Sequence, residues 1–295
     1  MNAKDRFRNL LILTVLLAQL LAPVVSYAGP AGQQPTPETR AQALLDELTP
    51  EERVGQLFLV SFEGGQITED SPIYNLIANH HIGGVILKNK NGNFPGPEDT
   101  LHSAWQLTQA LQTTEWISSQ DQLLDPLTNE PFSPHFIPLF IGINQNGDGA
   151  PSDQLFTGLT PLPSQMAIGA TWNPDLAFRV GAVLGQELEI LGINLLLGPS
   201  LDVLEDPRPD RAGDLGISRF GGDPYWVGLM GQSYIAGVHS GSKDHIALVA
   251  KHFPGLSGAD RPPEEEIPTV RKSLQQLTDV ELVPFFAVTG DAPVS

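Results

Sequence analysis

Helical and strand-like patterns alternate along most of this 295-residue chain, and the alternation restricts the possible folds more than any other feature of the sequence. Five short apolar runs have the length and composition of buried parallel strands. They span residues 57–62, 85–87, 139–143, 193–197 and 246–250. Strands separated by helices form parallel sheets that those helices cover. The sequence therefore predicts an α/β fold built on a parallel sheet.

Helical patterns fill the intervals between these runs. Thr49 has the character of an N-cap, because Pro50 follows at the first helical position and Glu51 and Glu52 stand in the first turn. Other helices are expected at residues 41–48, 71–78, 98–113, 174–191, 225–240, 271–277 and 281–286. Residues 119–137, rich in Pro, Asp and Asn, are expected to form a long loop at a lid or rim.

The repeated units favour a β/α barrel over an open nucleotide-binding sheet. No Gly-x-Gly-x-x-Gly sequence opens any of the expected helices. A closed barrel of this kind has eight strands, and the chain supplies about five, at most six. We therefore expect the amino-terminal part of a (β/α)₈ TIM-type barrel, with an unpaired strand edge flanked by apolar side chains.

Composition limits the class of ligand. The chain is 41% hydrophobic, which suits one large domain with a full core. Its formal net charge is -18 with 16 lysine and arginine residues, so a nucleic acid is a disfavoured partner, because phosphate binding needs clustered basic side chains. The absence of cysteine excludes disulfides, thiolate metal sites and a cysteine nucleophile. Neutral or cationic ligands fit this composition better.

The first residues have the pattern of an export signal. Lys4, Arg6 and Arg8 precede an apolar run at residues 10–22, and a small-residue cleavage site follows at 26–28. An uncleaved membrane anchor is the alternative, although the run is short for a span. The chain is thus expected to divide into a signal peptide at 1–28, a flexible leader at 29–39 and the barrel domain at 40–295. We therefore expect a secreted or extracytoplasmic protein that is not stably inserted in a membrane after cleavage of the signal peptide.

The last strand-like run ends in charged residues. Lys251 and His252 follow it directly and precede Phe-Pro-Gly at 253–255. In parallel sheets and barrels, ligand sites form at the carboxyl ends of the strands. Lys251 and His252 are therefore the first candidates for a binding site. The alternative is a surface lysine beside a histidine whose ring is satisfied by a neighbouring carbonyl.

Two other motifs fail on their spacing. Residues 144–149 imitate the start of a calcium loop, but Leu155 stands at the twelfth position, where a bidentate Glu is needed. Residues 255–259 imitate a nucleophile elbow, but they lack the final Gly and follow a Pro-Gly turn instead of opening a helix. We therefore expect neither a metal nor a cofactor.

Several short sequences occur in the order seen in the catalytic barrel of glycoside hydrolase family 3, the group of β-glucosidases and β-N-acetylhexosaminidases. They are LTPEERVGQL at 48–57, GGVIL at 83–87, LPSQMAIGAT at 162–171, LGIN at 191–194, GPSLDV at 198–203 and KHFPG at 251–255. From about residue 48 to its end the chain resembles this family. The resemblance implies a (β/α)₈ barrel in which Lys251 and His252 bind sugar hydroxyls, a role that their hydrogen-bond donors suit.

The resemblance also implies a carboxylate nucleophile and an acid that protonates the leaving oxygen. In the family the nucleophile is an Asp after a later strand, so no residue of this chain has that role. The hexosaminidase branch often carries its acid as Asp-x-His on the loop after Lys-His-Phe-Pro-Gly. Asp260 matches the Asp, but Arg261-Pro262 stands where Ser-His is expected, and Leu256 replaces a second His. One possibility is that the glutamates at 264–266 supply the acid, with a pKa tuned by burial, and the other is that catalysis is lost. The alternative for these three glutamates is a solvated surface segment without a catalytic role.

Four further residues are candidates for substrate binding by the same resemblance. Asn144 stands where the family usually has an Asp that holds two hydroxyls, and an amide lacks the charge-assisted bonds of a carboxylate. Asp202 is retained, and Arg208 lies near the position of the family's Asn-Pro-Arg-Asn-Pro. Arg219 belongs to a Ser-Arg-Phe-Gly sequence that transposes the family's Arg-Ser-Phe-Gly, whose Arg reaches the ligand. The alternative for Arg219 is an ion pair with a nearby Asp.

We therefore expect an exported hydrolase of O-glycosidic bonds that, at full length, releases terminal β-N-acetylhexosamine or β-glucose by a retaining mechanism. The hexosaminidase branch is preferred because the Lys-His-Phe-Pro-Gly-x-x-Gly motif resembles that branch more closely than it resembles the glucosidases. A catalytically degenerate, carbohydrate-binding pseudoenzyme is the alternative, favoured by Asn144 and the missing loop histidine. A structural envelope protein without a ligand is the third possibility, and a filled barrel mouth would indicate it.

Overall fold

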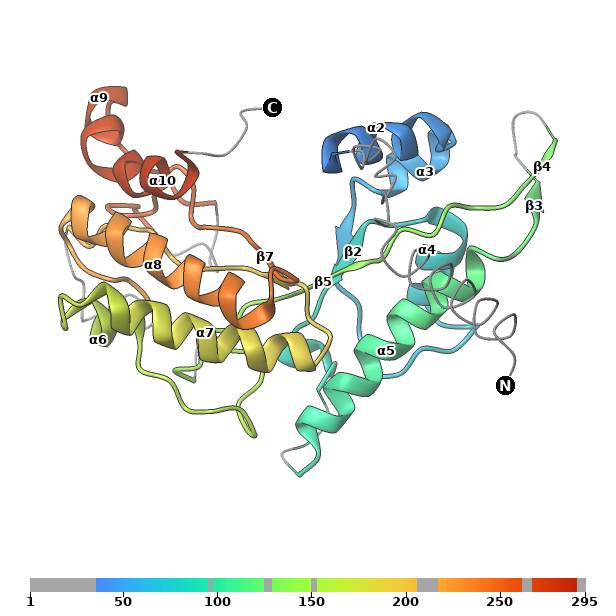
Figure 1. The fold of residues 1–295 in the computed structure, drawn as a ribbon, viewed down its shortest axis with the longest axis horizontal. Helices are drawn as coiled ribbons and strands as arrows, with labels where there is room; N and C mark the ends of the chain where they lie inside the picture. The colour runs from blue at the N-terminus through green and yellow to red at the C-terminus, as the bar shows by residue number, and fades with distance from the viewer. Residues whose placement is uncertain are drawn as a thin grey trace, which may run out of the picture. The chain divides into compact units, whose positions relative to one another are not determined.

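The computed structural model describes residues 36–94, 96, 98–124, 129–149, 153–205, 217–261 and 267–290 (Figure 1). The chain divides into two units, residues 1–47 and 48–295. In the first unit, helix α2 (Pro37–Glu47) begins before the expected helix, inside the segment predicted to be a flexible leader. The predicted signal peptide lies outside the described residues. None of the described helices combines the length and apolarity needed to cross a membrane.

A parallel sheet of five strands forms the centre of the second unit, counted over the residues that the structure describes. Its strands are β1 (Leu59–Val60), β2 (Gly84–Ile86), β5 (Phe140–Ile143), β6 (Leu195–Leu196) and β7 (Ala247–Leu248). They pair in chain order without a reversal, as in a barrel wall, whereas open nucleotide-binding sheets reverse their order at the ligand crevice. The five predicted runs are confirmed as strands, in the arrangement of a partial TIM-type barrel.

Four helices begin at side-chain caps. Thr49 and Glu52 form a reciprocal capping box at α3 (Pro50–Gly55), and Ser71, Asn173 and Asp223 cap helices that open with proline. The helices of this unit are α3, α4 (Pro72–His80), η1 (Asn89–Asn91), α5 (Thr100–Ser118), α6 (Gln165–Gly169), α7 (Pro174–Ile190), α8 (Pro224–Ser242), α9 (Leu274–Gln276), the π-helical η2 (Leu277–Glu281) and α10 (Leu282–Thr289).

Two short pieces of structure differ from the prediction. The segment expected to be a plain loop contains an antiparallel ribbon of β3 (Leu123–Leu124) and β4 (Pro131–Phe132). Helix α6, which was not expected, occupies part of the stretch before α7. Both elements are too short for their hydrophobic period to be visible in the sequence, since a helical period needs a window of about 11 residues or more.

The two faces of the sheet have different surroundings. Residues alternate between the faces along each strand, so in β5 Ile141 and Ile143 are completely buried whereas Phe140 is 47% exposed. Leu59 lies on the same face as Phe140, because both are in register with Gly84, and it is also 47% exposed. One face is thus covered by helices, and the other, which corresponds to the barrel interior, presents apolar side chains.

Helices α7 and α8 lie side by side in very close contact (Figure 1). A Cβ atom at Gly181 of α7 would lie 2.2 Å from the Tyr234 carbonyl oxygen of α8, and one at Gly237 of α8 would lie 2.0 Å from the Phe178 carbonyl oxygen of α7. Only glycine permits such an approach of two backbones. The glycines therefore fix α7 and α8 against each other and bring the first turns of both helices to the same side of the unit.

Candidate functional site

The carboxyl ends of neighbouring strands bring together side chains that are far apart in the sequence. Lys251 follows β7 and Asn144 follows β5, and the Lys251 Nζ atom donates a hydrogen bond to Asn144 Oδ1 at 2.8 Å. Both side chains are half-buried. The structure thus places these two predicted site residues in contact, with an ammonium group held at the end of the sheet where ligands bind in barrels.

His252 and Asp202 form the second contact at this end. The His252 Nδ1 atom lies 2.7 Å from Asp202 Oδ2, and the His252 and Leu256 backbone N–H groups donate to Asp202 Oδ1 at 3.3 Å and 2.8 Å. The Asp202 side chain is only 2% exposed, whereas the His252 side chain is 44% exposed. Ser200 adds a hydrogen bond from its Oγ atom at 3.0 Å. Asp202 is therefore a buried anchor, and the histidine ring is the part that a ligand can reach.

The state of this pair follows from its surroundings. Burial acts to raise the pKa of Asp202, but the hydrogen bond and charge of His252, the Leu256 N–H and the charge of Arg219 together hold that pKa below its usual value. An ionised carboxylate only accepts hydrogen bonds, so the His252 Nδ1 atom must carry the proton. The His252 Nε2 atom is then the nitrogen available to a sugar hydroxyl.

The structure describes one of the two candidate arginines, Arg219 and Arg208, and not the other. Arg219 lies close enough for its charge to act on Asp202, and it is half-buried. The structure therefore associates Arg219 with the same strand ends as Lys251 and His252. Arg208 belongs to the segment 206–216, which is outside the described residues, so its role remains a prediction.

Asp260 is held by its own neighbours. Its carboxylate accepts hydrogen bonds from Arg261 Nε at 3.3 Å, from Arg261 Nη2 at 3.0 Å and from the Thr269 backbone N–H at 2.8 Å. The Arg261 hydrogen bond, followed by that of Thr269, lowers the pKa of Asp260. A general acid at neutral pH needs a raised pKa instead. The glutamates at 264–266 lie outside the described residues, and the identity of the acid stays a prediction.

Sequence reasoning missed a buried cluster beside this site. Lys272 Nζ donates to Glu281 Oε1 at 2.5 Å and also contacts Glu205, which lies just after the Asp202 loop. Glu281 is completely buried, and its Oε2 atom has no hydrogen-bond partner among the residues that the structure describes. A Cβ atom at Gly255 would lie 2.5 Å from that oxygen. The Pro-Gly turn after His252 therefore rests on Glu281, and no local pattern in the sequence marks this contact.

In the loop after β5, which begins with the calcium-like sequence, an aspartate binds the backbone. The Asp153 carboxylate accepts hydrogen bonds from the backbone N–H groups of Asn146, Gly147 and Gly149 at 2.6 to 3.2 Å. Within the part of the chain that the structure describes, no group of three or more His, Asp or Glu side chains is arranged to hold a metal. The loop is closed by its own aspartate, which fixes the backbone that follows Asn144.

Comparison with known proteins agrees with this arrangement. Residues 49–295 match the model of the Glycosyl hydrolase family 3 N terminal domain. The chain belongs to this family. The resemblance inferred from the short sequences is thereby confirmed, as is the assignment of the parallel sheet to a partial TIM-type barrel.

Individual family members are similar over part of their length. The chain is 29% identical over 153 residues to a β-hexosaminidase of Pseudomonas aeruginosa, covering 52% of this chain and 43% of that protein. It is 32% identical over 182 residues to a probable β-glucosidase H of Emericella nidulans, covering 60% and 21%. The solved structure of a family 3 β-N-acetylglucosaminidase from Paenibacillus superposes with a TM-score of 0.66 at 29% identity, covering 82% of this chain and 40% of that one. The chain thus spans less than half of the length of each of these three relatives.

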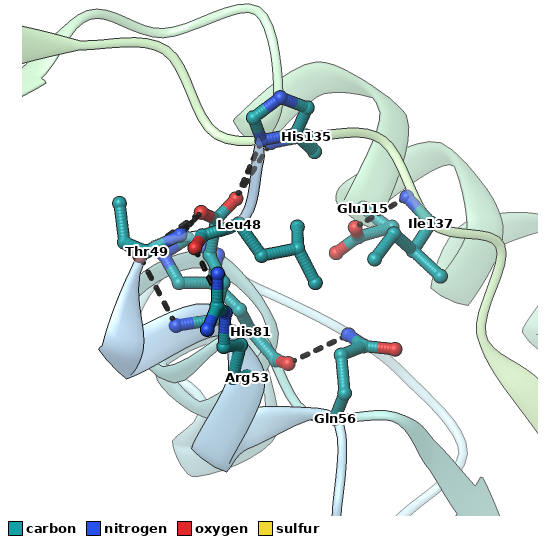
Figure 2. Close-up of polar contacts among 9 residues, drawn as sticks. Leu48, Thr49, Arg53, Gln56, His81, Glu115, His135 and Ile137 are labelled. Atoms are coloured by element: carbon teal, nitrogen blue, oxygen red, sulfur yellow. Dashed lines mark hydrogen bonds and ion pairs between the residues drawn. The ribbon is translucent and has the colours of Figure 1, made fainter. Parts of the chain in front are cut away.

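A second polar cluster lies at the amino ends of the strands (Figure 2). The Glu52 carboxylate accepts hydrogen bonds from Thr49 N at 2.8 Å, from Thr49 Oγ1 at 2.9 Å and from His135 N at 2.7 Å. The His135 Nδ1 atom lies 3.3 Å from the same carboxylate. Glu52 thereby ties the start of α3 to the segment that leads into β5. In barrel enzymes this end of the sheet serves stability.

Glu115 belongs to the same end of the family domain (Figure 2). This residue is 3% exposed, and its Oε1 atom accepts a long hydrogen bond of 3.4 Å from Ile137 N. Within the described part of the chain, its Oε2 atom has no hydrogen-bond partner. Burial is the largest of the effects that raise its pKa to about 7, and the charge of Glu52 adds to it. Between about pH 4.5 and pH 7, where an exposed glutamate is ionised, Glu115 is therefore largely protonated.

Proposed function

We propose that the full-length protein hydrolyses O-glycosidic bonds and releases terminal β-N-acetylhexosamine, or β-glucose, from a carbohydrate. The observation that carries the proposal is the pair of oriented polar groups at the strand ends: the Lys251 ammonium, a donor held by Asn144, and the His252 ring, held by Asp202 with its Nε2 atom as an acceptor. An uncharged ligand rich in hydroxyl groups is bound by such donors and acceptors. Membership of family 3, and relatives named as hexosaminidase and glucosidase, support the reaction class.

The described residues account for holding the sugar and not for breaking the bond. Hydrolysis with retention needs two carboxyl groups, one as nucleophile and one as acid. Asp202 is buried and occupied by His252, Leu256 and Ser200, and Asp260 is paired with Arg261. We therefore assign Lys251, with His252 and Asn144, to sugar binding. The nucleophile is assigned to no residue of this chain.

A carbohydrate-binding protein without catalysis is the second candidate. It is favoured by Asn144, whose amide oxygen accepts from Lys251 where the family's carboxylate would carry charge, and by the engagement of Asp260 with Arg261. The pattern at residues 1–28 further supports the proposal that the protein is exported. Both candidates place the same sugar at the same strand ends and differ in turnover.

Calorimetric titration with N-acetylglucosamine tests the binding proposal. Lys251→Met should weaken binding about tenfold, because losing a charged hydrogen bond costs roughly 1.5 kcal/mol or more. Its melting temperature should stay nearly unchanged. Lys243→Met is the matched control, since Lys243 is 73% exposed and forms only a surface ion pair with Glu189 at 3.6 Å. A lowered melting temperature with unaltered affinity would assign Lys251 to the fold instead of to the site. Parallel titration with glucose distinguishes the two sugar classes.

A further inference from the structure

Three aromatic side chains form an exposed cluster that the site described above does not use. The ring centroids of Trp172 and Trp226 are 5.0 Å apart with planes at 87°, and those of Tyr225 and Trp226 are 5.7 Å apart at 80°. Trp172 is 58% exposed and Tyr225 is 66% exposed. We call Trp172, Tyr225 and Trp226 the aromatic platform. A contiguous group of large exposed apolar side chains often marks a binding site, whereas single exposed apolar side chains are normal on protein surfaces.

The fold positions the platform at the first turns of α7 and α8. Trp172 immediately precedes Asn173, the N-cap of α7, and Tyr225 and Trp226 follow Asp223, the N-cap of α8. The backbone of Trp172 is left-handed, with φ of 52°, which is rare for a bulky side chain. Such conformations persist where the surroundings enforce them, and they cluster at ligand sites. The close contact of α7 and α8 then brings the three rings together.

The platform lies on the same side of the sheet as the donors at the strand ends. In β/α units, the helix after a strand starts beside the carboxyl end of that strand. Helix α8 follows β6 through the loop that carries Arg219, the residue whose charge acts on Asp202. Part of this loop is fixed by a hydrogen bond of 2.8 Å from Leu204 N to the Gly221 carbonyl oxygen. A short piece of chain therefore runs from the site to Tyr225.

We propose that the aromatic platform binds an outer pyranose ring of a β-linked oligosaccharide whose terminal unit lies at Lys251 and His252. This inference rests on the proposed function. A β-linked pyranose has equatorial hydroxyls around its edge and C–H groups on its faces, so an aromatic ring covers a face while the edge stays in water. The net charge of -18 disfavours anionic occupants such as nucleic acids, and it does not disfavour a neutral sugar.

A second aromatic pair supplies a matched control. Trp116 and Phe136 have centroids 5.0 Å apart with planes at 86°, and Trp116 is 52% exposed. This pair has the geometry of Trp172 and Trp226, but it lies near the end of α5 and ahead of β5, at the amino ends of the strands. A saccharide that starts at Lys251 and extends over the platform does not involve Trp116.

The test is calorimetric titration of the whole chain with N-acetylglucosamine and with its β-1,4-linked trimer. The wild-type protein should bind the trimer more tightly than the monomer. Trp172→Ala and Tyr225→Ala should each weaken trimer binding about fivefold and leave monomer binding unchanged, since only the trimer reaches the platform. Trp172→Phe, which keeps an aromatic face, should restore most of the loss. Trp116→Ala should change neither affinity, and near-ultraviolet circular dichroism checks that each variant is folded.

Three results would overturn the inference. In the first, Trp172→Ala and Tyr225→Ala leave trimer binding unchanged, whereas Lys251→Met weakens it. This result would leave the proposed function intact. The second is a wild-type dimer in analytical ultracentrifugation that Trp172→Ala abolishes, which would make the platform an interface between copies of the chain. The third is a wild-type protein that binds neither sugar, which would remove the proposed function together with this inference.

Discussion

The carboxyl and amino ends of the parallel strands both carry buried charged groups, but the two groups are built differently. At the carboxyl end, side chains hold other side chains, as Asp202 holds His252 and Asn144 holds Lys251, and the held groups reach the surface. At the amino end, the Glu52 carboxylate accepts hydrogen bonds from two backbone N–H groups and from the hydroxyl of its own cap residue, and it also lies 3.3 Å from His135 Nδ1. The first arrangement orients groups for a ligand, and the second joins segments of the fold.

Glu115 and Asp202, one buried carboxyl group from each end, have pKa values that are shifted in opposite directions. Burial, without a compensating cation, raises the pKa of Glu115 to about 7. At the other end burial also acts to raise the pKa of Asp202, but His252, the Leu256 N–H and the charge of Arg219 together outweigh it and the pKa is lowered. A buried carboxyl that is kept ionised by a partner can orient that partner, whereas one that is kept neutral mainly adds to packing. The difference distinguishes Asp202 from Glu115 alone, because burial also acts to raise the pKa of Glu52 at the amino end, where hydrogen bonds from His135 and Thr49 lower it.

Removing Glu52 should have the largest effect on stability and none on sugar binding. Glu52→Ala deletes three hydrogen bonds and half of a capping box, so the free energy of unfolding should fall by about 3 kcal/mol. Chemical denaturation measures this change, and titration with N-acetylglucosamine measures the affinity. Glu51→Ala is the control in the same helical turn, because the Glu51 Oε2 atom has no hydrogen-bond partner in the described ranges of the chain. An affinity loss at unchanged stability would reverse the roles assigned to the two ends.

The second prediction is that protonation of Glu115 makes the stability of the protein depend on pH. Its folded-state pKa of about 7 lies above the ordinary value of 4.5, so between these values the folded protein binds a proton that the unfolded chain has released. The contribution of Glu115 to stability is therefore complete below about pH 4.5 and is lost as the pH rises to about 7, a change on the order of 3 kcal/mol. Glu115→Gln should remove this decline.

Denaturation curves from about pH 4.5 to about pH 8 check this prediction. The exposed Glu69 provides the control substitution Glu69→Gln, which should leave the decline in place. Sugar affinity should not follow the same titration, because Glu115 lies at the amino end. A Glu115→Gln protein with the same pH profile as the wild type would show that Glu115 is not protonated in the folded state.

A smaller effect, shared between stability and binding, is expected at Asp202. In Asp202→Asn the amide nitrogen can donate to His252 Nδ1, so the proton on the ring moves to Nε2 and the group presented to the ligand changes from acceptor to donor. Stability should fall by about 1.5 kcal/mol, since a hydrogen bond to a charged group is lost. Nitrogen NMR of the His252 ring would report the tautomer. An unchanged tautomer would contradict the account of this pair.

Much of the fold could be predicted because local patterns specify it. The Thr49-Pro50 cap, the apolar runs and the prolines that open α4, α7 and α8 give the positions of strands and helices. The strands are shorter than the runs, as β6 at Leu195–Leu196 illustrates, because a run of apolar residues also covers the turns that leave the sheet. The ribbon of β3 and β4 could not be predicted, since two residues show no period.

Candidate residues were predictable where the chain itself marks them. Lys251 and His252 interrupt an apolar run at a strand end, which is a local signal. The contact of Glu52 with His135, 83 residues later, and that of Glu281 with Gly255 depend on the tertiary fold and leave no such signal. The sequence also offers no indication that Arg261 pairs with Asp260 and lowers its pKa.

A crystal structure of the protein with N-acetylglucosamine tests most directly whether the carboxyl ends of the strands form the sugar site. The account predicts a pyranose ring at the ends of β5, β6 and β7, with hydroxyl oxygens within about 3 Å of Lys251 Nζ and of the His252 ring. Glu52 and Glu115 should be untouched. A sugar bound at the amino ends of the strands, or one that leaves Lys251 on Asn144 alone, would contradict the assignment.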